Sequence, residues 1–163
     1  MKMPSNVAAW LQFKLYLITL SGYTADSFAC AKPGELNDDP KFRWQFAVDM
    51  IYRGILCGLM NVWDGRELRP LGEKTFALVN ELAQFDPDSD SESSLGCWVG
   101  PEIEATDLCE ALVNKFDIPN FEQGQICVPF IEEIEALFDR NGVSWSDAPL
   151  IELESGASRA EHR

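Results

Sequence analysis

The chain has 163 residues, and a typical domain contains about 100–200, so one domain is expected. Its 46% hydrophobic, 11% aromatic and 25% charged residues are ordinary for a folded protein and exclude wholesale disorder. The 13 Lys and Arg residues stand against 27 Asp and Glu, which gives a formal net charge of −14. Direct binding to nucleic acid is therefore disfavoured, because phosphate contacts require a cationic surface. We predict one globular domain over residues 1–151 and a disordered tail over 152–163.

Much catalytic and metal chemistry lacks its side chains in this sequence. The single histidine, His162, lies in the terminal tail, which is a poor place to hold an imidazole against a nucleophile or a zinc ion. No two of the five cysteines have the close spacing of a zinc clamp, and Cys57, Cys109 and Cys127 lie in apolar runs typical of core positions. We predict no metal, no cofactor and no enzymatic turnover.

The sequence also argues against a membrane protein and a phosphate-binding loop. The most apolar N-terminal stretch, Val7 to Leu20, is interrupted by Gln12 and Lys14 and is shorter than the ~20 residues of a membrane span. No secretory signal pattern is present, and an odd number of cysteines is typical of reduced thiols. The glycines never adopt a phosphate-loop spacing. We expect a cytoplasmic protein without a membrane partner.

In chain order, the first predicted helix covers Asn6 to Leu20, where apolar residues recur at helical spacing. A polar loop over 21–39 follows, and Asp39-Pro40 reads as an N-cap with a first-turn proline. The next helix, 41–60, is apolar almost all round. Its polar residues Lys41, Gln45, Asp49 and Arg53 form one stripe, with Asp49 and Arg53 placed to pair. A helix exposed to solvent along a single edge must be packed on its other sides, so we predict that it is central.

The remaining elements are three further helices. They are expected over 73–85, from Pro101 or Thr106 to Phe116, and over 129–140, with a solvated loop over 86–94 and a connector over 61–71. The fold is therefore predicted to be mainly α, with about five helices packed around 41–60. A short strand or hairpin near 60–70 is left open, since Met60-Asn61-Val62-Trp63 precedes the turn residues Asp64-Gly65.

The negative charge is confined to one half of the chain. Residues 1–65 contain six basic and six acidic side chains, whereas residues 86–154 contain 17 acids against Lys115 and Arg140. We expect Glu104, Asp107 and Glu110 to form an acidic ridge on the fourth helix, and Glu132, Glu135 and Asp139 another on the fifth. Such ridges are compatible with simple solvation of outward faces. A one-sided excess of this size also steers cationic partners.

The aromatic helix and the residues after it resemble a known class of protein. The run FRWQFAVDMIYRGILCGLMNVW, residues 42–63, closes on Gly-Leu and a short strand-like piece. It is similar in style, over about residues 40–100, to the small acidic immunity proteins that bacteria make against contact-dependent or other polymorphic toxins. The resemblance implies binding to a cognate toxin domain, often a basic nuclease, and carries no catalytic residues.

Three functions remain open at this stage. The first is neutralisation of a basic toxin enzyme through an acidic surface of Asp86, Asp88, Asp90, Glu92, Glu104, Asp107 and Glu110. Trp98 is the candidate anchor of that surface, with a core position beside Cys97 and Val99 as the alternative. The second is an adaptor or secretion chaperone with an apolar groove. The third is a carboxylate-based hydrolase, for which no pair of acids is singled out.

Overall fold

A computed structural model describes residues 1–65 and 69–154 of the chain. Within this part the helices are α1 (Ser5–Leu20), α2 (Pro40–Leu56), α3 (Thr75–Gln84), α4 (Glu92–Trp98), α5 (Asp107–Lys115) and α6 (Val128–Arg140). The strands are β1 (Tyr23–Thr24), β2 (Met60–Asp64), β3 (Arg69–Pro70) and β4 (Pro101–Ala105). Short 3-10 helices cover Ala25–Phe28, Gly72–Lys74 and Ile118–Asn120. The mainly helical prediction is thus confirmed in outline, and a small sheet is added to it.

The sheet is antiparallel throughout and has the strand order β1-β4-β2-β3. β2 matches the predicted short strand. β4, in contrast, occupies residues 101–105, which would be helical if the fourth helix started at Pro101 rather than at Thr106. Ile103 points into the core opposite Val62, while Glu102 and Glu104 point outward opposite Trp63 and Asn61. This alternation has the period of two that a half-buried strand requires, so residues 101–105 are a strand and the helix begins only after Thr106.

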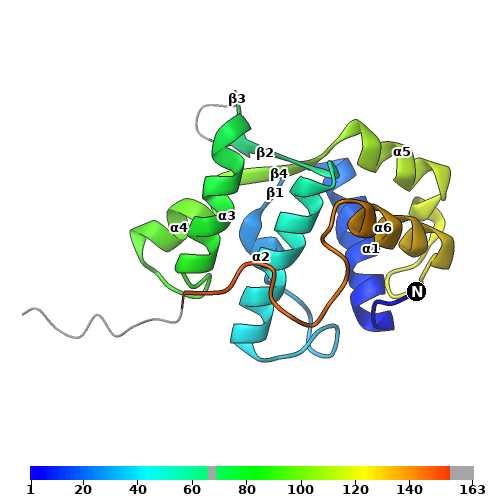
Figure 1. Ribbon diagram of the computed structural model, residues 1–163, viewed down its shortest axis with the longest axis horizontal. Coiled ribbons are helices and arrows are strands. Elements are labelled where there is room, and N and C mark those ends of the chain that lie inside the picture. The colour runs from blue at the N-terminus through cyan, green and yellow to red at the C-terminus, as the bar shows by residue number, and fades with distance from the viewer. Residues whose placement is uncertain (66–68, 155–163) are drawn as a thin grey trace, which may run out of the picture.

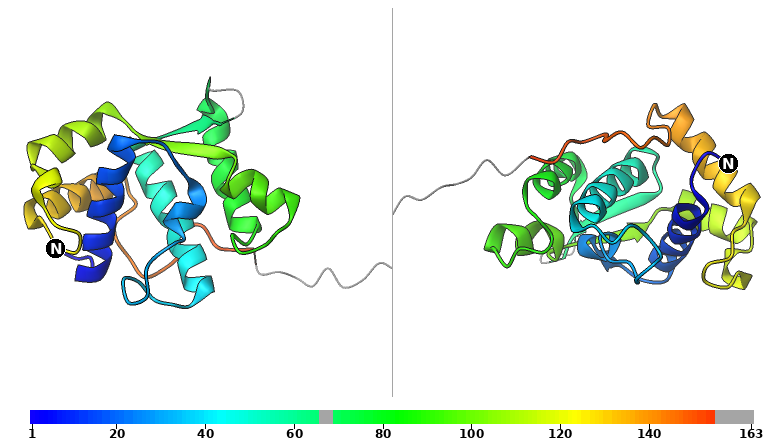
Figure 2. Two further views of the ribbon diagram at one scale, coloured as in Figure 1. Left: turned by 180° about the vertical axis from the view of Figure 1, so that it is seen from behind. Right: turned by 90° about the horizontal axis from the view of Figure 1, so that it is seen from below.

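The inner face of the sheet packs on α1 and α2, and the molecule is elongated along the direction of β4 (Figure 1). β4 leads from α4 at one end to α5 at the other, and α1 and α6 lie together near the α5 end. The view from behind and the view from below place α2 between α1 and α3 (Figure 2). The central position predicted for α2 is therefore correct.

The ends of α2 follow from its flanking residues. The Asp39 side chain accepts a hydrogen bond of 3.1 Å from the Lys41 amide, and Pro40 occupies the first turn, as predicted. The helix ends at Leu56, and Gly58 has a φ of +70°, which glycine adopts without the strain of a side chain. This reversal sends Met60 into β2, so the expected helical continuation to residue 60 is wrong.

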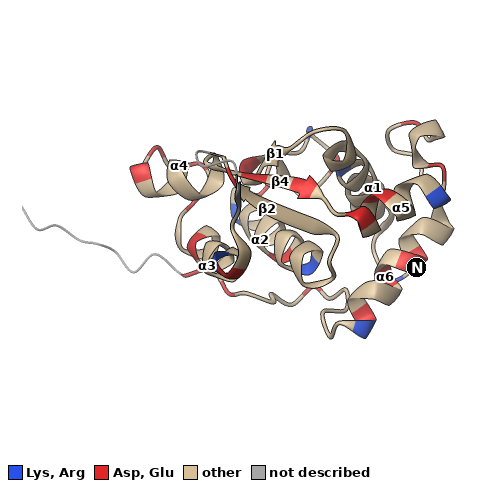
Figure 3. Ribbon diagram, turned by 90° about the horizontal axis from the view of Figure 1, so that it is seen from above, with Lys and Arg blue, Asp and Glu red and all other residues tan. Residues whose placement is uncertain are grey.

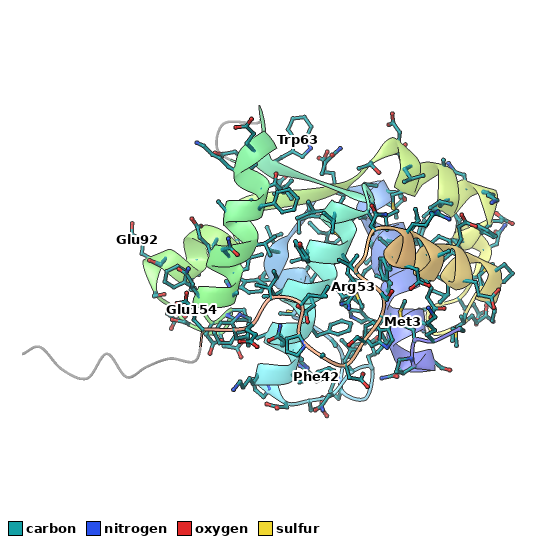
Figure 4. All side chains as sticks on the ribbon, viewed as in Figure 1. Met3, Phe42, Arg53, Trp63, Glu92 and Glu154 are labelled. Carbon is teal, nitrogen blue, oxygen red and sulfur yellow. The ribbon has the colours of Figure 1, made fainter. Side chains whose placement is uncertain are left out.

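From Gln45 to Arg53 the polar stripe of α2 lies beneath the C-terminal part of the chain, with Asp49 and Arg53 buried, which corrects the prediction of a solvated edge; only Lys41 in the first turn is exposed. Residues 143–154, the C-terminal strap, contain no helix or strand and cross α2 on their way from α6 to α3 (Figures 1 and 4). Arg53 is only 1% exposed and donates hydrogen bonds to the carbonyls of Val143 at 2.9 Å and Ser144 at 3.0 Å. Its guanidinium also lies 5.4 Å from the ring centroid of Trp145.

Asp49 and Gln45 continue the same attachment along α2. Oδ1 of Asp49 accepts from the amides of Leu150 and Ile151, each at 3.1 Å, and Gln45 donates to the Ile151 carbonyl at 2.7 Å. Burial raises the pKa of the Asp49 carboxyl, and the two amide hydrogen bonds and Arg53 act in the opposite direction. The polar side chains of α2 therefore form hydrogen bonds with backbone amides and carbonyls of the strap, which has no helix or strand to pair them.

The strap ends on α3. Leu153 packs against the core, and the Glu154 amide donates to the Ala83 carbonyl at 3.1 Å. Residues up to Glu154 therefore pack against the rest of the described chain, whereas the prediction assigned 152–154 to the tail. Residues 155–163, which include His162, lie outside the described residues, so the disorder predicted for this stretch stays a prediction.

Replacing Arg53 by Met is expected to lower the free energy of unfolding by roughly 2–4 kcal/mol. The substitution keeps an apolar side chain of similar length but leaves the buried carbonyl of Val143 and the partly buried carbonyl of Ser144 without their donor. Urea denaturation followed by circular dichroism measures the loss. Lys41→Met, on the exposed first turn of the same helix, is the control and should stay within about 0.5 kcal/mol of the parent. Equal values for the two variants would show that the strap is not held by Arg53.

Gly54→Ala is expected to destabilise the protein by about 1–3 kcal/mol, because a Cβ at residue 54 would overlap the buried side chain of Met60. Gly96→Ala is the matched control, since nothing lies within 4 Å of the corresponding Cβ position in α4. This control should stabilise by about 0.5–1 kcal/mol through the helix preference of alanine. Thermal unfolding of both variants gives the comparison, and the same sign for both would contradict the close contact of α2 with β2.

Candidate functional site

The acidic residues predicted to form one partner surface lie in two separate patches. The α4 acidic patch consists of Asp86, Asp88 and Asp90 in the loop before α4 and Glu92 in its first turn. The β4–α5 acidic patch consists of Glu102, Glu104, Asp107 and Glu110. Because α4 and α5 lie at opposite ends of the molecule, the predicted seven-carboxylate surface is not continuous (Figure 3). Figure 4 places Glu92 at the tip of the α4 end.

The β4–α5 acidic patch differs from the predicted helical ridge. Glu104 lies on β4, whereas Asp107 and Glu110 lie in the first turn of α5, so the three carboxylates do not share one helix face. A Cβ built at Gly22 would lie 2.9 Å from Oε2 of Glu102 and 3.4 Å from Oε1 of Glu104. These two carboxyl groups therefore converge over a residue without a side chain, on the outer face of the sheet.

Trp98 does not act as an exposed anchor, and the core alternative is the correct one. It is 1% exposed, and its indole Nε1 donates a hydrogen bond of 2.6 Å to the Phe85 carbonyl. The reason is the helix α4, which the sequence analysis missed because the residues up to 94 were assigned to a polar loop. Ser91 caps α4 by accepting from the Ser94 amide at 3.2 Å, and the helix then turns Cys97 and Trp98 inward.

The exposed apolar side chains of α4 are Leu95 and Val99 instead, at 49% and 47%. Val99 is the C-cap residue, so the two are four positions apart and lie on one side of the helix, with Glu92 about one turn before Leu95. Apolar side chains surrounded by polar ones are the usual composition of a protein-binding surface. The signal in the sequence is Ser91, a capping residue, followed by a mixture of small and apolar residues over 93–99.

The predicted ridge on α6 has a structural role. Glu135 is buried, and its Oε1 accepts from the amides of Lys2 and Met3, each at 2.6 Å. Asp139 pairs with Lys2 at 2.6 Å, and the hydrogen bond from Lys2 lowers the pKa of this carboxyl. The ridge expected at the surface thus fixes the N-terminal segment to α6, and α6 is not part of the candidate surface.

The cations of residues 1–65 are largely directed to other parts of the protein. Arg53 binds the strap, Lys14 donates to the Ser27 carbonyl at 2.8 Å, Lys2 pairs with Asp139, and Arg43 pairs with Asp38. In contrast, seven carboxylates of the two patches form no hydrogen bond or ion pair with any residue that the structure describes: Asp88, Asp90, Glu92, Glu102, Glu104, Asp107 and Glu110. The negative charge of residues 86–110 is therefore presented to solvent without local compensation.

A second candidate site is an open cleft of about 850 Å³ beside the N-terminal half of α1. This α1 cleft is lined by Trp10, Phe13 and Lys14 of α1, by Cys30 and Lys32, and by Ile126. Gln12 joins α1 to the opposite wall, since its Nε2 donates to the Gln125 carbonyl and its Oε1 accepts from the Cys127 amide. Burial lowers the pKa of the Lys14 ammonium, and the neighbouring Cys30 and Glu35 offset part of this effect.

The search for metal and membrane features gives two limited findings. Within residues 1–65 and 69–154, no group of three or more His, Cys, Asp or Glu side chains is arranged to hold a metal ion. No helix in the same part of the chain combines the length and apolar character needed to cross a bilayer.

Comparison of the chain with protein-family models, with curated proteins and with solved structures gives no match.

At pH 8, iodoacetamide is expected to alkylate Cys30 alone in the folded protein. Cys30 is exposed in the α1 cleft, whereas the other four cysteines are buried. Burial raises the pKa of Cys57 and Cys97 to about 11 and that of Cys109 to about 12, so their reactive thiolates are scarce. Intact mass spectrometry should show one added group in buffer and five in urea. Two or more rapid additions in buffer would contradict the burial of these thiols.

Proposed function

We propose that this protein binds a basic protein, a cognate toxin enzyme such as a nuclease, and inhibits it through the acidic surface of residues 86–110. The proposal is supported by one observation above the others. Seven carboxylates of this segment, exposed or half-buried, form no hydrogen bond or ion pair with the described residues, while four of the six cations of residues 1–65 bind carbonyls or acids of the chain. A field of one sign raises the association rate of oppositely charged partners by roughly 10–10³.

The α4 acidic patch is the proposed contact, with Leu95 and Val99 at its centre. Exposed apolar side chains supply the short-range binding energy that rim charges lack, and the surrounding carboxylates provide orientation and speed. The β4–α5 acidic patch contributes to the long-range field from the other end of the molecule. It also has an exposed leucine, Leu108, but that residue stands alone on α5 rather than forming a pair.

The partner can be identified by affinity capture from the native host followed by mass spectrometry. Support requires that the captured protein be basic, and that the purified protein abolish its enzymatic activity at a one-to-one molar ratio. Capture of a partner that remains fully active, or binding that is unaffected by salt, would instead favour the adaptor alternative. Metal-dependent hydrolysis by the isolated protein would contradict the proposal that it has no turnover.

Reversal of Asp88, Asp90 and Glu92 to Lys is expected to slow association with the partner by about tenfold or more and to reduce its dependence on salt. Leu95→Ala should leave association unchanged and accelerate dissociation by about tenfold. Stopped-flow binding at two ionic strengths separates the two effects.

The matched control is reversal of Glu104, Asp107 and Glu110, which changes the net charge equally at the other patch. If this control slows association more than the reversal in the α4 acidic patch does, and Leu95→Ala does not change dissociation, the contact lies on the β4–α5 acidic patch instead. Insensitivity of association to both reversals would show that the carboxylates only solvate the surface.

A further inference from the structure

The α1 cleft has the size and walls of a small-molecule site. Its volume of about 850 Å³ falls in the usual range for ligand pockets, roughly 300–1,000 Å³. Apolar groups of Trp10, Phe13 and Ile126 make up much of the lining. The walls come from three parts of the chain, and the bonds of Gln12 to residues 125 and 127 hold two of them together. The cleft is separate from both acidic patches and plays no part in the proposed inhibition.

The charged groups of the α1 cleft are unequally compensated. The Glu35 carboxylate accepts from the Lys32 amide at 2.8 Å and from the Gln123 side chain at 3.0 Å. Among the described residues the Lys14 ammonium has a single acceptor, the Ser27 carbonyl, and it lies over the Trp10 ring at 5.6 Å. A half-buried ammonium with one neutral acceptor retains two donor hydrogens and an unpaired positive charge. The lining of the cleft thus carries two cations, Lys14 and Lys32, against one carboxylate, Glu35.

Two further polar atoms near Lys14 are also without partners. Nε1 of Trp10, a residue that is 6% exposed, and Oγ of Ser27 form no hydrogen bond with the residues that the structure describes. Buried polar atoms are usually paired, so two unpartnered polar side-chain atoms beside one ammonium are unusual. The nearby Lys32 adds a second cation at the cleft, with only a long contact of 3.5 Å to Gln123.

We propose that the α1 cleft binds a small amphipathic carboxylate, with the carboxylate on the Lys14 ammonium and the apolar chain against Trp10, Phe13 and Ile126. The carboxylate supplies the charge that Lys14 lacks, and the apolar chain covers the exposed walls.

The test is isothermal titration calorimetry with decanoate as the probe, on the full chain. Decanoate should bind with a one-to-one stoichiometry, and decanol, which has the same chain without the charge, should bind about tenfold more weakly or not at all. Lys14→Met should weaken decanoate binding by about tenfold and leave decanol binding unchanged. Lys74→Met, an exposed site outside the cleft, is the matched control and should bind decanoate as the parent does.

A second variant keeps the proposal testable if loss of Lys14 disturbs folding. Ala9→Phe adds bulk to the wall of the cleft without removing a charge, and should abolish binding of both probes while circular dichroism and thermal unfolding stay near those of the parent. The proposal is overturned by the absence of decanoate binding at millimolar concentration, by equal binding to the parent and Lys14→Met, or by tighter binding of decylamine than of decanoate. None of these outcomes depends on the toxin partner, so failure here leaves the proposed inhibition standing.

Discussion

The attachment of the C-terminal strap to α2 is the interaction on which the rest of the structure depends. A segment without helix or strand leaves its backbone groups unpaired, and burial of such groups is costly unless side chains satisfy them. Gln45, Asp49 and Arg53, spaced one turn apart, meet this need along a single edge of α2. The helix is thereby enclosed by the sheet, α3 and the strap, which explains how a segment that is apolar on nearly every side exists inside a chain of this size.

The same requirement, that backbone groups without a partner be satisfied by side chains, determines where several charged residues lie. Buried or half-buried ionised groups are used where backbone atoms lack partners: Arg53 on the strap, Glu135 on the N-terminal segment and Lys14 on the Ser27 carbonyl. Four of the six cations of residues 1–65 are bound to carbonyls or carboxylates of the chain, whereas seven carboxylates between residues 86 and 110 form no hydrogen bond or ion pair with a described residue. The acidic surface is therefore as much a consequence of how the basic residues are used as of the number of acids.

Periodicity in the sequence predicted the helices well wherever one face is continuously apolar. The expected helix over 6–20 matches α1, that over 129–140 matches α6, and the Asp39-Pro40 start of α2 is confirmed. Prediction failed where long-range contacts decide the outcome. Glu104 has helical spacing to Asp107, but its pairing with Asn61 of β2 makes it a strand residue. Asp49 and Glu135 have the spacing of solvated helix positions, but each accepts hydrogen bonds from backbone amides that are distant in the sequence. Trp98 was misplaced for a local reason, because the cap at Ser91 was overlooked.

The position of β4 in the sheet has a consequence for the order in which the chain folds during synthesis. β4 lies between β1 and β2, and these two strands are neighbours of β4 rather than of each other. The sheet consequently cannot close until residues 101–105 have left the ribosome, although β1 and β2 are made long before them. Until then the nascent chain carries strand edges that lack their partner, and such edges pair readily with other chains. Loop closure over nearly eighty residues, from β1 to β4, also favours slow folding relative to a simple helical bundle of this length.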